Sequence, residues 1–117
     1  GIFYSNQGIL FMARIPHAIE ARIQRYLLDL AENNIRIRRA YVFGSYARGT
    51  YDEWSDIDIA LVSDGFDGDR IADKNKIRRI TLRAGSDIEP LPFTLDEFNE
   101  SNPLVKEILT HGIEIPT

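Results

Sequence analysis

Apolar residues recur at helical spacing near the start of the chain, between Pro16 and Asn33. Charged side chains separate them, which gives the segment one apolar face and one polar face. Pro16 suits the first turn of a helix, and Asn33 followed by Asn34 suits a helix end. The pattern therefore predicts a helix over residues 16–33, with an apolar face formed by Ile19, Ile23, Tyr26, Leu27 and Leu30.

Two strands are predicted to follow this helix. Residues 35–43 alternate at first and then become fully apolar, which is typical of a strand buried on both faces. Gly44 ends this strand, and residues 44–49 are predicted to form one or two helical turns. The chain then returns as a second strand over residues 56–62, which is rich in β-branched and aliphatic side chains.

The second half of the chain predicts another helix and an edge strand. The helix extends from Asp69 to about Leu82, and its apolar side is expected to consist of Ile71, Ile77, Ile80 and Leu82. Residues 88–93 predict a short strand that carries two prolines. Because proline cannot donate a backbone hydrogen bond, this strand is expected at an edge of the sheet or with an irregular end.

The end of the chain predicts a last helix and a short strand. Thr94 and Glu97 have the spacing of a capping box. Residues 101–109 predict a helix with an apolar stripe, and residues 113–115 can pair as a terminal strand. The order α-β-β-α-β-α, without an internal repeat or linker, indicates one small α/β (α+β) domain with a mixed sheet.

The composition is that of one globular domain: 117 residues, of which 44% are hydrophobic and 27% charged. The absence of cysteine excludes disulfides, thiolate zinc sites and a cysteine nucleophile, and it suits a cytoplasmic protein. No apolar run approaches the ~20 residues needed to cross a bilayer. Residues 1–11 differ in character from the rest of the chain. We interpret them as an expression remnant or an over-extended start, with the domain at residues 12–117.

Charge is distributed unevenly along the chain. The net charge of −4 argues against a broad surface for nucleic acid, although a nucleic acid acceptor is not excluded. Acidic residues crowd between positions 52 and 69, and a basic stretch follows between Lys74 and Arg83. Such neighbouring clusters suit a site that binds cations and phosphates together, and the basic stretch could receive a polyanionic acceptor or an acidic partner. Two solvated faces of opposite sign explain the same pattern equally well.

Asp56 and Asp58 lie two positions apart on the predicted second strand, so their side chains point to the same face, opposite Ile57 and Ile59. Carboxylates this close repel each other, and burying both without a cation is unfavourable. The pair is therefore a candidate site for a divalent metal ion. The spacing alone is weak evidence, because it is also common on the exposed face of an antiparallel strand.

Gly44 and Ser45 follow the end of the first strand and form a candidate phosphate-binding segment. A glycine lets the backbone approach a ligand closely, and the serine hydroxyl with the N–H groups of an opening helical turn can bind phosphate. Arg48 lies about one turn further on and could add a positive charge. A short connection then returns the chain antiparallel, which is expected to bring the two aspartates beside this segment.

Together these motifs resemble the DNA polymerase β-like nucleotidyltransferase superfamily, and within it the minimal nucleotidyltransferases. The family pattern is a Gly-Ser, then an Ala-Arg-Gly, then Ser-Asp-h-Asp-h, where h is an apolar residue. This chain has Gly44-Ser45-Tyr46-Ala47-Arg48-Gly49 and then Ser55-Asp56-Ile57-Asp58-Ile59. The resemblance extends from about Arg14 to the end of the chain.

The resemblance implies a third carboxylate on a neighbouring strand. Asp87 and Glu89 flank Ile88, so both can point to the same face. Relatives carry a glutamate at the place where this chain has Ile88-Glu89-Pro90, which favours Glu89. Asp87 is the alternative.

By resemblance, the mechanism is a two-metal nucleotidyl transfer. Asp56, Asp58 and Glu89 would be the catalytic carboxylates and would hold Mg²⁺ or Mn²⁺. The nucleotide, ATP or another NTP, would be bound by Gly44, Ser45, Arg48 and Ser55. Arg48 and Thr50 are weaker candidates, because each could equally hold the loop. The aromatic residues of the same segment, interpreted as packing residues with base stacking as the alternative, are Tyr46, Tyr51 and Trp54.

The implied activity is transfer of NMP, with AMP as the first choice, onto an acceptor hydroxyl. Minimal members of the family often act beside a small helical HEPN protein, so the resemblance also implies the antitoxin of a HEPN/MNT toxin–antitoxin pair. The alternative function is a nucleotide-binding, non-catalytic antitoxin or interaction module that acts by complex formation. A homo-oligomer would be expected to use helices or the N-terminal arm, because an edge strand with two prolines is a poor template for pairing.

Overall fold

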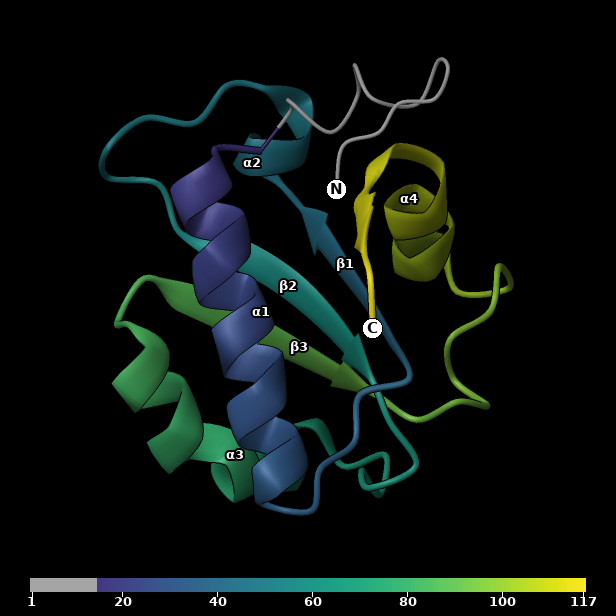
Figure 1. The fold of residues 1–117 in the computed structure, drawn as a ribbon. Coiled ribbons are helices and arrows are strands. Elements are labelled where there is room, and N and C mark those ends of the chain that lie inside the picture. Colours follow the sequence, from purple (N-terminus) through teal and green to yellow (C-terminus); the bar gives the residue numbers. More distant parts are fainter. Residues whose placement is uncertain (1–14) are drawn as a thin grey trace.

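Four strands form one mixed sheet in the computed structural model, which describes residues 15–117 (Figure 1). Their order is β3-β2-β1-β4; β1 pairs antiparallel with β2 and β4, and β3 pairs parallel with β2. The elements are α1 (His17–Glu32), β1 (Arg39–Phe43), α2 (Ser45–Arg48), β2 (Ile57–Val62), α3 (Arg70–Ala84), β3 (Ile88–Phe93), α4 (Pro103–His111) and β4 (Ile113–Ile115). The predicted fold class and element order are confirmed.

The interpretation of residues 1–11 as a remnant or extended start lies outside the described residues, as does the first part of the domain at 12–14. Within residues 15–117, no helix is long and apolar enough to cross a membrane.

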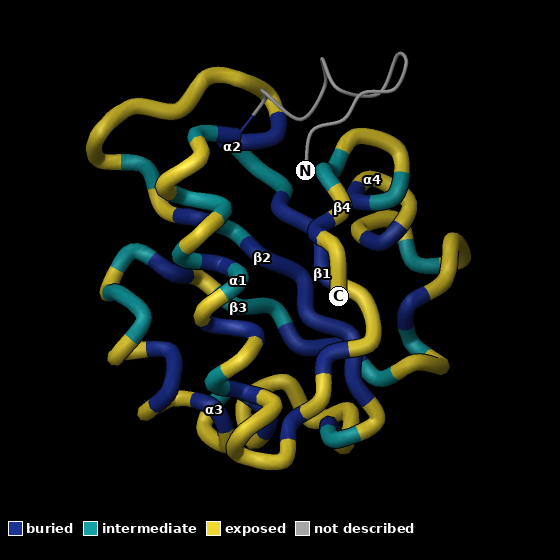
Figure 2. The backbone as a smooth tube through the Cα atoms, viewed as in Figure 1, coloured by how far each residue is buried: buried dark blue, intermediate teal, exposed yellow. Residues whose placement is uncertain are grey.

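The sheet is covered on both faces. α1 and α3 cover one face, and α1 crosses in front of the strands in Figure 1. Ile57 and Ile59 of β2 are fully buried in this layer, on the side that the alternation predicted. On the opposite face, Ala60 and Val62 pack with α4 and with Phe98 of the segment before it. β1 and β2 therefore form the buried centre of the molecule (Figure 2).

β1 is shorter than the sequence predicts. Residues 35–38 lie before the strand, and β1 begins at Arg39 because its partner strand ends at Val62, directly opposite. Ile35 and Ile37 are nevertheless buried in the first core layer. The apolar pattern therefore indicated burial correctly, but it could not show that no strand is available for these residues to pair with.

The predicted apolar side of α3 is confirmed only in part. Ile71 and Leu82, expected in the core, are 75% and 60% exposed. Ile77 and Ile80 are buried as predicted, and the other two inward-facing residues are Asp73 and Thr81. The prediction was wrong for Ile71 and Leu82 because two polar residues occupy buried positions, which a hydrophobic pattern assigns to solvent.

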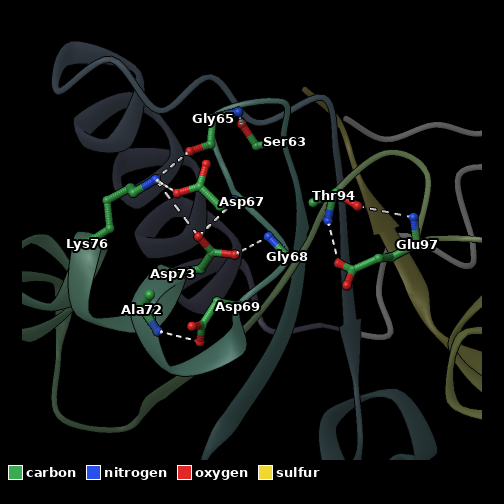
Figure 3. Close-up of polar contacts among 10 residues, drawn as sticks. All are labelled: Ser63, Gly65, Asp67, Gly68, Asp69, Ala72, Asp73, Lys76, Thr94 and Glu97. Atoms are coloured by element: carbon green, nitrogen blue, oxygen red, sulfur yellow. Dashed lines mark hydrogen bonds and ion pairs between the residues drawn. The ribbon is translucent and has the colours of Figure 1, made fainter.

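Asp73 is buried because its carboxylate anchors the loop that enters α3 (Figure 3). It accepts hydrogen bonds from the backbone N–H groups of Asp67 and Gly68, each at 2.9 Å, and the ammonium of Lys76 lies 3.9 Å away. Hydrogen bonds from two N–H groups compensate the loss of water around the carboxylate. The same bonds fix the chain reversal between β2 and α3.

β3 is an edge strand, as its two prolines predicted. The N–H of Ile57 donates to the carbonyl of Asp87 at 2.7 Å. This bond determines which residues of β3 direct their backbone groups toward β2 and which direct them away. Odd-numbered residues of β3 therefore bond toward β2, whereas Pro90 and Pro92 point their backbone to the free edge. The prolines remove no ladder hydrogen bond, and they leave the edge without the N–H groups that another strand would need.

The capping-box pair at Thr94 and Glu97 forms its hydrogen bonds but does not begin a helix (Figure 3). The N–H of Thr94 donates to Oε1 of Glu97 at 2.9 Å, and the N–H of Glu97 donates to Oγ1 of Thr94 at 3.2 Å. Turns continue until Pro103, where α4 begins with Asn102 as its cap. The pair thus holds the link that packs Phe98 against the second face of the sheet.

Candidate active site

Three neighbouring strands bring the predicted site residues to one end of the sheet. Asp58 on β2 lies opposite Phe43, the last residue of β1, and opposite Glu89 on β3. Residues in register point to the same face, so the side chains of Asp58 and Glu89 are neighbours. Gly44 comes directly after Phe43 and begins α2. α4 packs chiefly against β1, so Asp58 stays half-buried and Glu89 exposed.

Gly44 lets the carboxylate of Asp58 lie against the backbone of the Gly-Ser segment. Its φ of 72° is in the left-handed region, and a Cβ placed on it would be 2.2 Å from Oδ2 of Asp58. The sequence predicted a glycine that makes room for a ligand. In the structure, the group that needs this room is one of the predicted metal-binding carboxylates.

The pKa of Asp58 is raised above its ordinary value. Burial is the largest cause, the negative charges of Asp56 and Glu89 add to it, and the positive charge of Arg48 opposes it. The ionised form of Asp58 is therefore in an unfavourable field that a bound cation would relieve. The same interactions place these four predicted site residues in one electrostatic neighbourhood.

Asp56, Asp58 and Glu89 offer carboxylate oxygens, which are the ligands that Mg²⁺ and Mn²⁺ prefer. Among residues 15–117, however, no three His, Asp or Glu side chains are gathered into a complete ion site. Mg²⁺ at nucleotide sites is commonly held by one or two carboxylates together with the phosphates of the substrate. The residues present therefore fit a metal ion that binds with its nucleotide.

The nucleotide-binding candidates differ in their surroundings. Ser45 is the first residue of α2, and its hydroxyl makes no hydrogen bond to the described part of the chain. Arg48, at the other end of α2, is exposed, as is Thr50. The hydroxyl of Ser55 instead accepts a hydrogen bond from the N–H of Asp52 at 2.9 Å and closes the loop before β2. Ser45 and Arg48 are thus open to a ligand, whereas Ser55 holds the loop.

The three aromatic residues of this region behave differently. Tyr46 is buried, as expected of a packing residue. Tyr51 stacks on it with the ring centroids 4.3 Å apart, but Tyr51 is itself exposed. Trp54 is 84% exposed, and its interpretation as a packing residue is wrong. The backbone N–H of Trp54 donates to the side chain of Asp52 at 2.8 Å. This hydrogen bond forms a turn without burying the indole ring.

Comparison with sequence models of protein families identifies the family of this chain. The sequence model of the family described as polymerase beta, nucleotidyltransferase matches residues 26–116. The chain belongs to this family. This confirms the resemblance to nucleotidyltransferases that the Gly-Ser and Asp-x-Asp motifs indicated.

One curated relative shares a short segment at high identity. A candidate protein adenylyltransferase of Methanocaldococcus jannaschii is 62% identical over 29 residues. These residues make up 25% of this chain and 29% of the relative, so the match spans less than a third of that protein.

Solved structures are similar over most of the chain. A crystal structure of a toxin–antitoxin with AMP-PNP has a TM-score of 0.58 and 27% identity, covering 83% of this chain and 72% of that one. The toxin–antitoxin MntA-HpeT with two aspartates, two positions apart, replaced by glutamate has a TM-score of 0.57 and 25% identity at the same coverage. A candidate nucleotidyltransferase of Sulfolobus solfataricus, at 21% identity and a TM-score of 0.59, covers 81% and 77% and shares the fold.

Glu89, rather than Asp87, lies in register with Asp58 in this nucleotidyltransferase. Asp87 lies just before β3 and forms a two-pronged ion pair with Arg22 of α1, at 2.6 Å and 3.1 Å. Arg22 also donates to the carbonyl of Ala84 at 3.1 Å. The alternation that allowed both carboxylates on one face does not hold: the carbonyl of Asp87 still accepts a hydrogen bond from Ile57, but β3 begins only at Ile88, and the side chain of Asp87 turns toward Arg22 of α1.

Replacing Asp87 by asparagine is expected to lower the free energy of unfolding at pH 7 by about 0.5–1 kcal/mol. The effect is small because the side chains of Arg22 and Asp87 are 36% and 39% exposed. The hydrogen bonds from Arg22 hold the pKa of Asp87 below its ordinary value of 3.8. The ion pair therefore stabilises the fold above that value, and its contribution is lost as the pH falls through the lowered pKa. Urea denaturation of both proteins between pH 7 and pH 3 measures this; an equal difference at both ends would exclude the ion pair as the cause.

Proposed function

We propose that this chain is a metal-dependent nucleotidyltransferase that moves AMP from ATP onto a hydroxyl group of a partner protein. The observation that carries the proposal is the position of Asp58, whose carboxylate lies against Gly44 of the phosphate-binding segment and beside Glu89. The relative described as a candidate protein adenylyltransferase and the similar structure with AMP-PNP support ATP as the donor.

In the proposed reaction, the acceptor oxygen forms a bond to the α-phosphorus of ATP, the bond between that phosphorus and the β-phosphate oxygen breaks, and pyrophosphate leaves. The hydroxyl proton passes to the carboxylate of Glu89. Ser45 and Arg48 bind the phosphates, and Asp56 and Asp58 would hold Mg²⁺ or Mn²⁺. When bound, the metal would supply positive charge to the triphosphate and to the developing pyrophosphate. The raised pKa of Asp58 fits a carboxylate whose negative charge would be fully balanced only when the metal ion and the nucleotide are bound.

The partner is proposed to be the toxin of a toxin–antitoxin pair. Two of the similar solved structures are toxin–antitoxin structures, and one of them carries changes at two aspartates with the spacing of Asp56 and Asp58. The family resemblance further suggests that the partner is a helical HEPN protein. In this role the chain would act as the antitoxin, by modifying the partner or by masking it.

The proposal is tested by transfer of label from [α-³²P]ATP in the presence of Mg²⁺ and the protein encoded next to this one. The wild-type chain is expected to label the partner, and the label should disappear with EDTA and with the double variant D56N/D58N. The matched control D64N/D96N removes the same charge from two exposed positions outside the site and should retain labelling.

A different outcome would favour the non-catalytic alternative. If the wild-type chain binds the partner and ATP without labelling it, and D56N/D58N binds the partner equally well, transfer to this partner is excluded. The chain would then act as a nucleotide-binding interaction module.

A further inference from the structure

A groove runs along the outside of the sheet, between α3 and the free edge of β3. Its volume is about 330 Å³, and its walls include Lys74, Arg78 and Leu82 of α3 and Ser86, Glu89 and Pro90 at the start of β3. Glu89 thus borders two regions at once: it is the neighbour of Asp58 in the sheet and it forms part of the groove wall. Glu89 is therefore the residue that links the groove to the proposed reaction centre.

Two cations in this groove have no protein partner. Near α3, Lys76 contacts Asp67 and Arg22 contacts Asp87. Arg79 and Arg83, which lie outside this groove, make no side-chain ion pair or hydrogen bond within the described residues. The side chains of Lys74 and Arg78, which line the groove, make no ion pair or hydrogen bond within the described residues. Positive charges that a fold leaves unpaired beside a concave surface are available to an anionic ligand.

The same side of α3 also exposes two large aliphatic residues. Ile71 and Leu82 lie seven residues before and four residues after Arg78, so these three side chains project from one stripe of the helix. Ile71 is 75% exposed and Leu82 60% exposed. The stripe does not pack on the core, since the opposite side of α3 does so. Unpaired cations flanked by exposed aliphatic residues are a combination found at protein–protein contacts.

We propose that this groove binds an acidic segment of the acceptor protein and presents its hydroxyl group to Glu89. The inference rests on the proposed function, and it assigns the acceptor-binding surface of the same site. Lys74 and Arg78 pair with carboxylates of the segment, and Leu82 and Pro90 contact its apolar side chains. The segment is recognised through side chains rather than by strand addition, because Pro90 and Pro92 leave the edge without donors.

A nucleic acid acceptor fits the groove less well. Single strands are usually bound by stacking bases on aromatic side chains, and the walls of this groove contain none in the described part of the chain. The net charge of the chain is −4, which disfavours a phosphate backbone beyond the two cations. An acidic peptide needs only a few charge pairs and gains apolar contacts in addition.

The test uses a fluorescein-labelled random copolymer of glutamate and tyrosine as an acidic, hydroxyl-bearing probe. Its binding is measured by fluorescence anisotropy, which does not require catalysis. The groove variant K74E/R78E is compared with R79E/R83E, which makes the same change of charge on the same helix, at exposed positions outside the groove. The groove variant is expected to weaken binding at least tenfold, and the control variant less than threefold. Label transfer from [α-³²P]ATP to the neighbour-encoded partner should show the same order.

The outcomes separate this inference from the proposed function. Equal weakening by both variants, or no binding of the copolymer by the wild-type chain, would overturn the groove assignment. Tighter binding of a single-stranded oligonucleotide, lost in K74E/R78E, would overturn the choice of a protein segment. Labelling that occurs but is insensitive to K74E/R78E would refute the groove alone, whereas the absence of labelling from all proteins would refute the transferase proposal.

Discussion

Replacing Asp58 by asparagine is expected to abolish nucleotide transfer and, at the same time, to raise the melting temperature of the metal-free protein. The loss of activity should be about 10³-fold or more, because a metal-binding carboxylate supports several kcal/mol of charge stabilisation in the transition state. The gain in stability comes from the environment of the side chain. Asparagine has nearly the same shape but carries no charge that burial and two neighbouring carboxylates disfavour.

The sign of the stability effect depends on pH. Burial, Asp56 and Glu89 raise the pKa of Asp58 above its ordinary value of 3.8. A carboxyl group with a raised pKa in the folded state favours folding below the ordinary value, and this contribution is lost as the pH rises through the raised pKa. At pH 7 the ionised side chain therefore destabilises the fold, and its removal should raise Tm by about 2–4 °C. Below pH 3.8 the difference should vanish.

A matched variant tests whether the charge of Asp58 destabilises the metal-free fold. Asp64 is exposed, and hydrogen bonding to Arg38 lowers its pKa, so Asp64→Asn should slightly lower Tm at pH 7 and leave transfer unchanged. Thermal melts without divalent metal, combined with the labelling assay, give both readouts. A lower Tm for Asp58→Asn would mean that Asp58 stabilises the metal-free fold, which would contradict the electrostatic account of the site.

Much of the site could be predicted because one short piece of chain supplies most of it. Gly44, Ser45, Asp56 and Asp58 lie within 15 consecutive positions, and antiparallel pairing of the flanking strands brings the two ends of the piece together. Strand alternation then determines that Asp58 faces away from the buried layer beneath α1. These are local consequences of backbone geometry, which a sequence pattern records well.

Contacts between distant residues could not be predicted in this way. Asp87 and Glu89 have similar surroundings in the sequence, and what separates them is the guanidinium of Arg22, 65 positions earlier in the chain. The buried face of α3 was predicted only in part, for a related reason. The carboxylate of Asp73 is compensated by N–H groups of a loop, and no hydrophobic scale contains that information.

The conformation of Gly44 was also beyond sequence analysis, and it leads to the second large effect. Gly44→Ala is expected to destabilise the fold by about 2–4 kcal/mol, which corresponds to a drop in Tm of roughly 10–20 °C for a domain of this size. One part of this is the backbone, because φ is 72° and ψ is −145°, a combination that is essentially restricted to glycine. The other part is the contact with Asp58, whose Oδ2 would be 2.2 Å and whose Cγ would be 3.2 Å from the new methyl group.

Gly49 provides a control for the backbone part alone. Its φ of 76° is also in the left-handed region, but a Cβ placed on it has no atom within 4 Å. Gly49→Ala should therefore lower stability by only about 1 kcal/mol and retain activity, whereas Gly44→Ala should lose transfer because Asp58 is displaced. Urea denaturation of both variants, and of Gly44→Ala combined with Asp58→Ala, separates the two parts. In the Asp58→Ala background, Gly44→Ala should lower the free energy of unfolding by less, because the contact between the new methyl group and the carboxylate of Asp58 is absent. An unchanged effect would show that the backbone alone is responsible, and that Asp58 does not depend on Gly44 for its place beside the Gly-Ser segment.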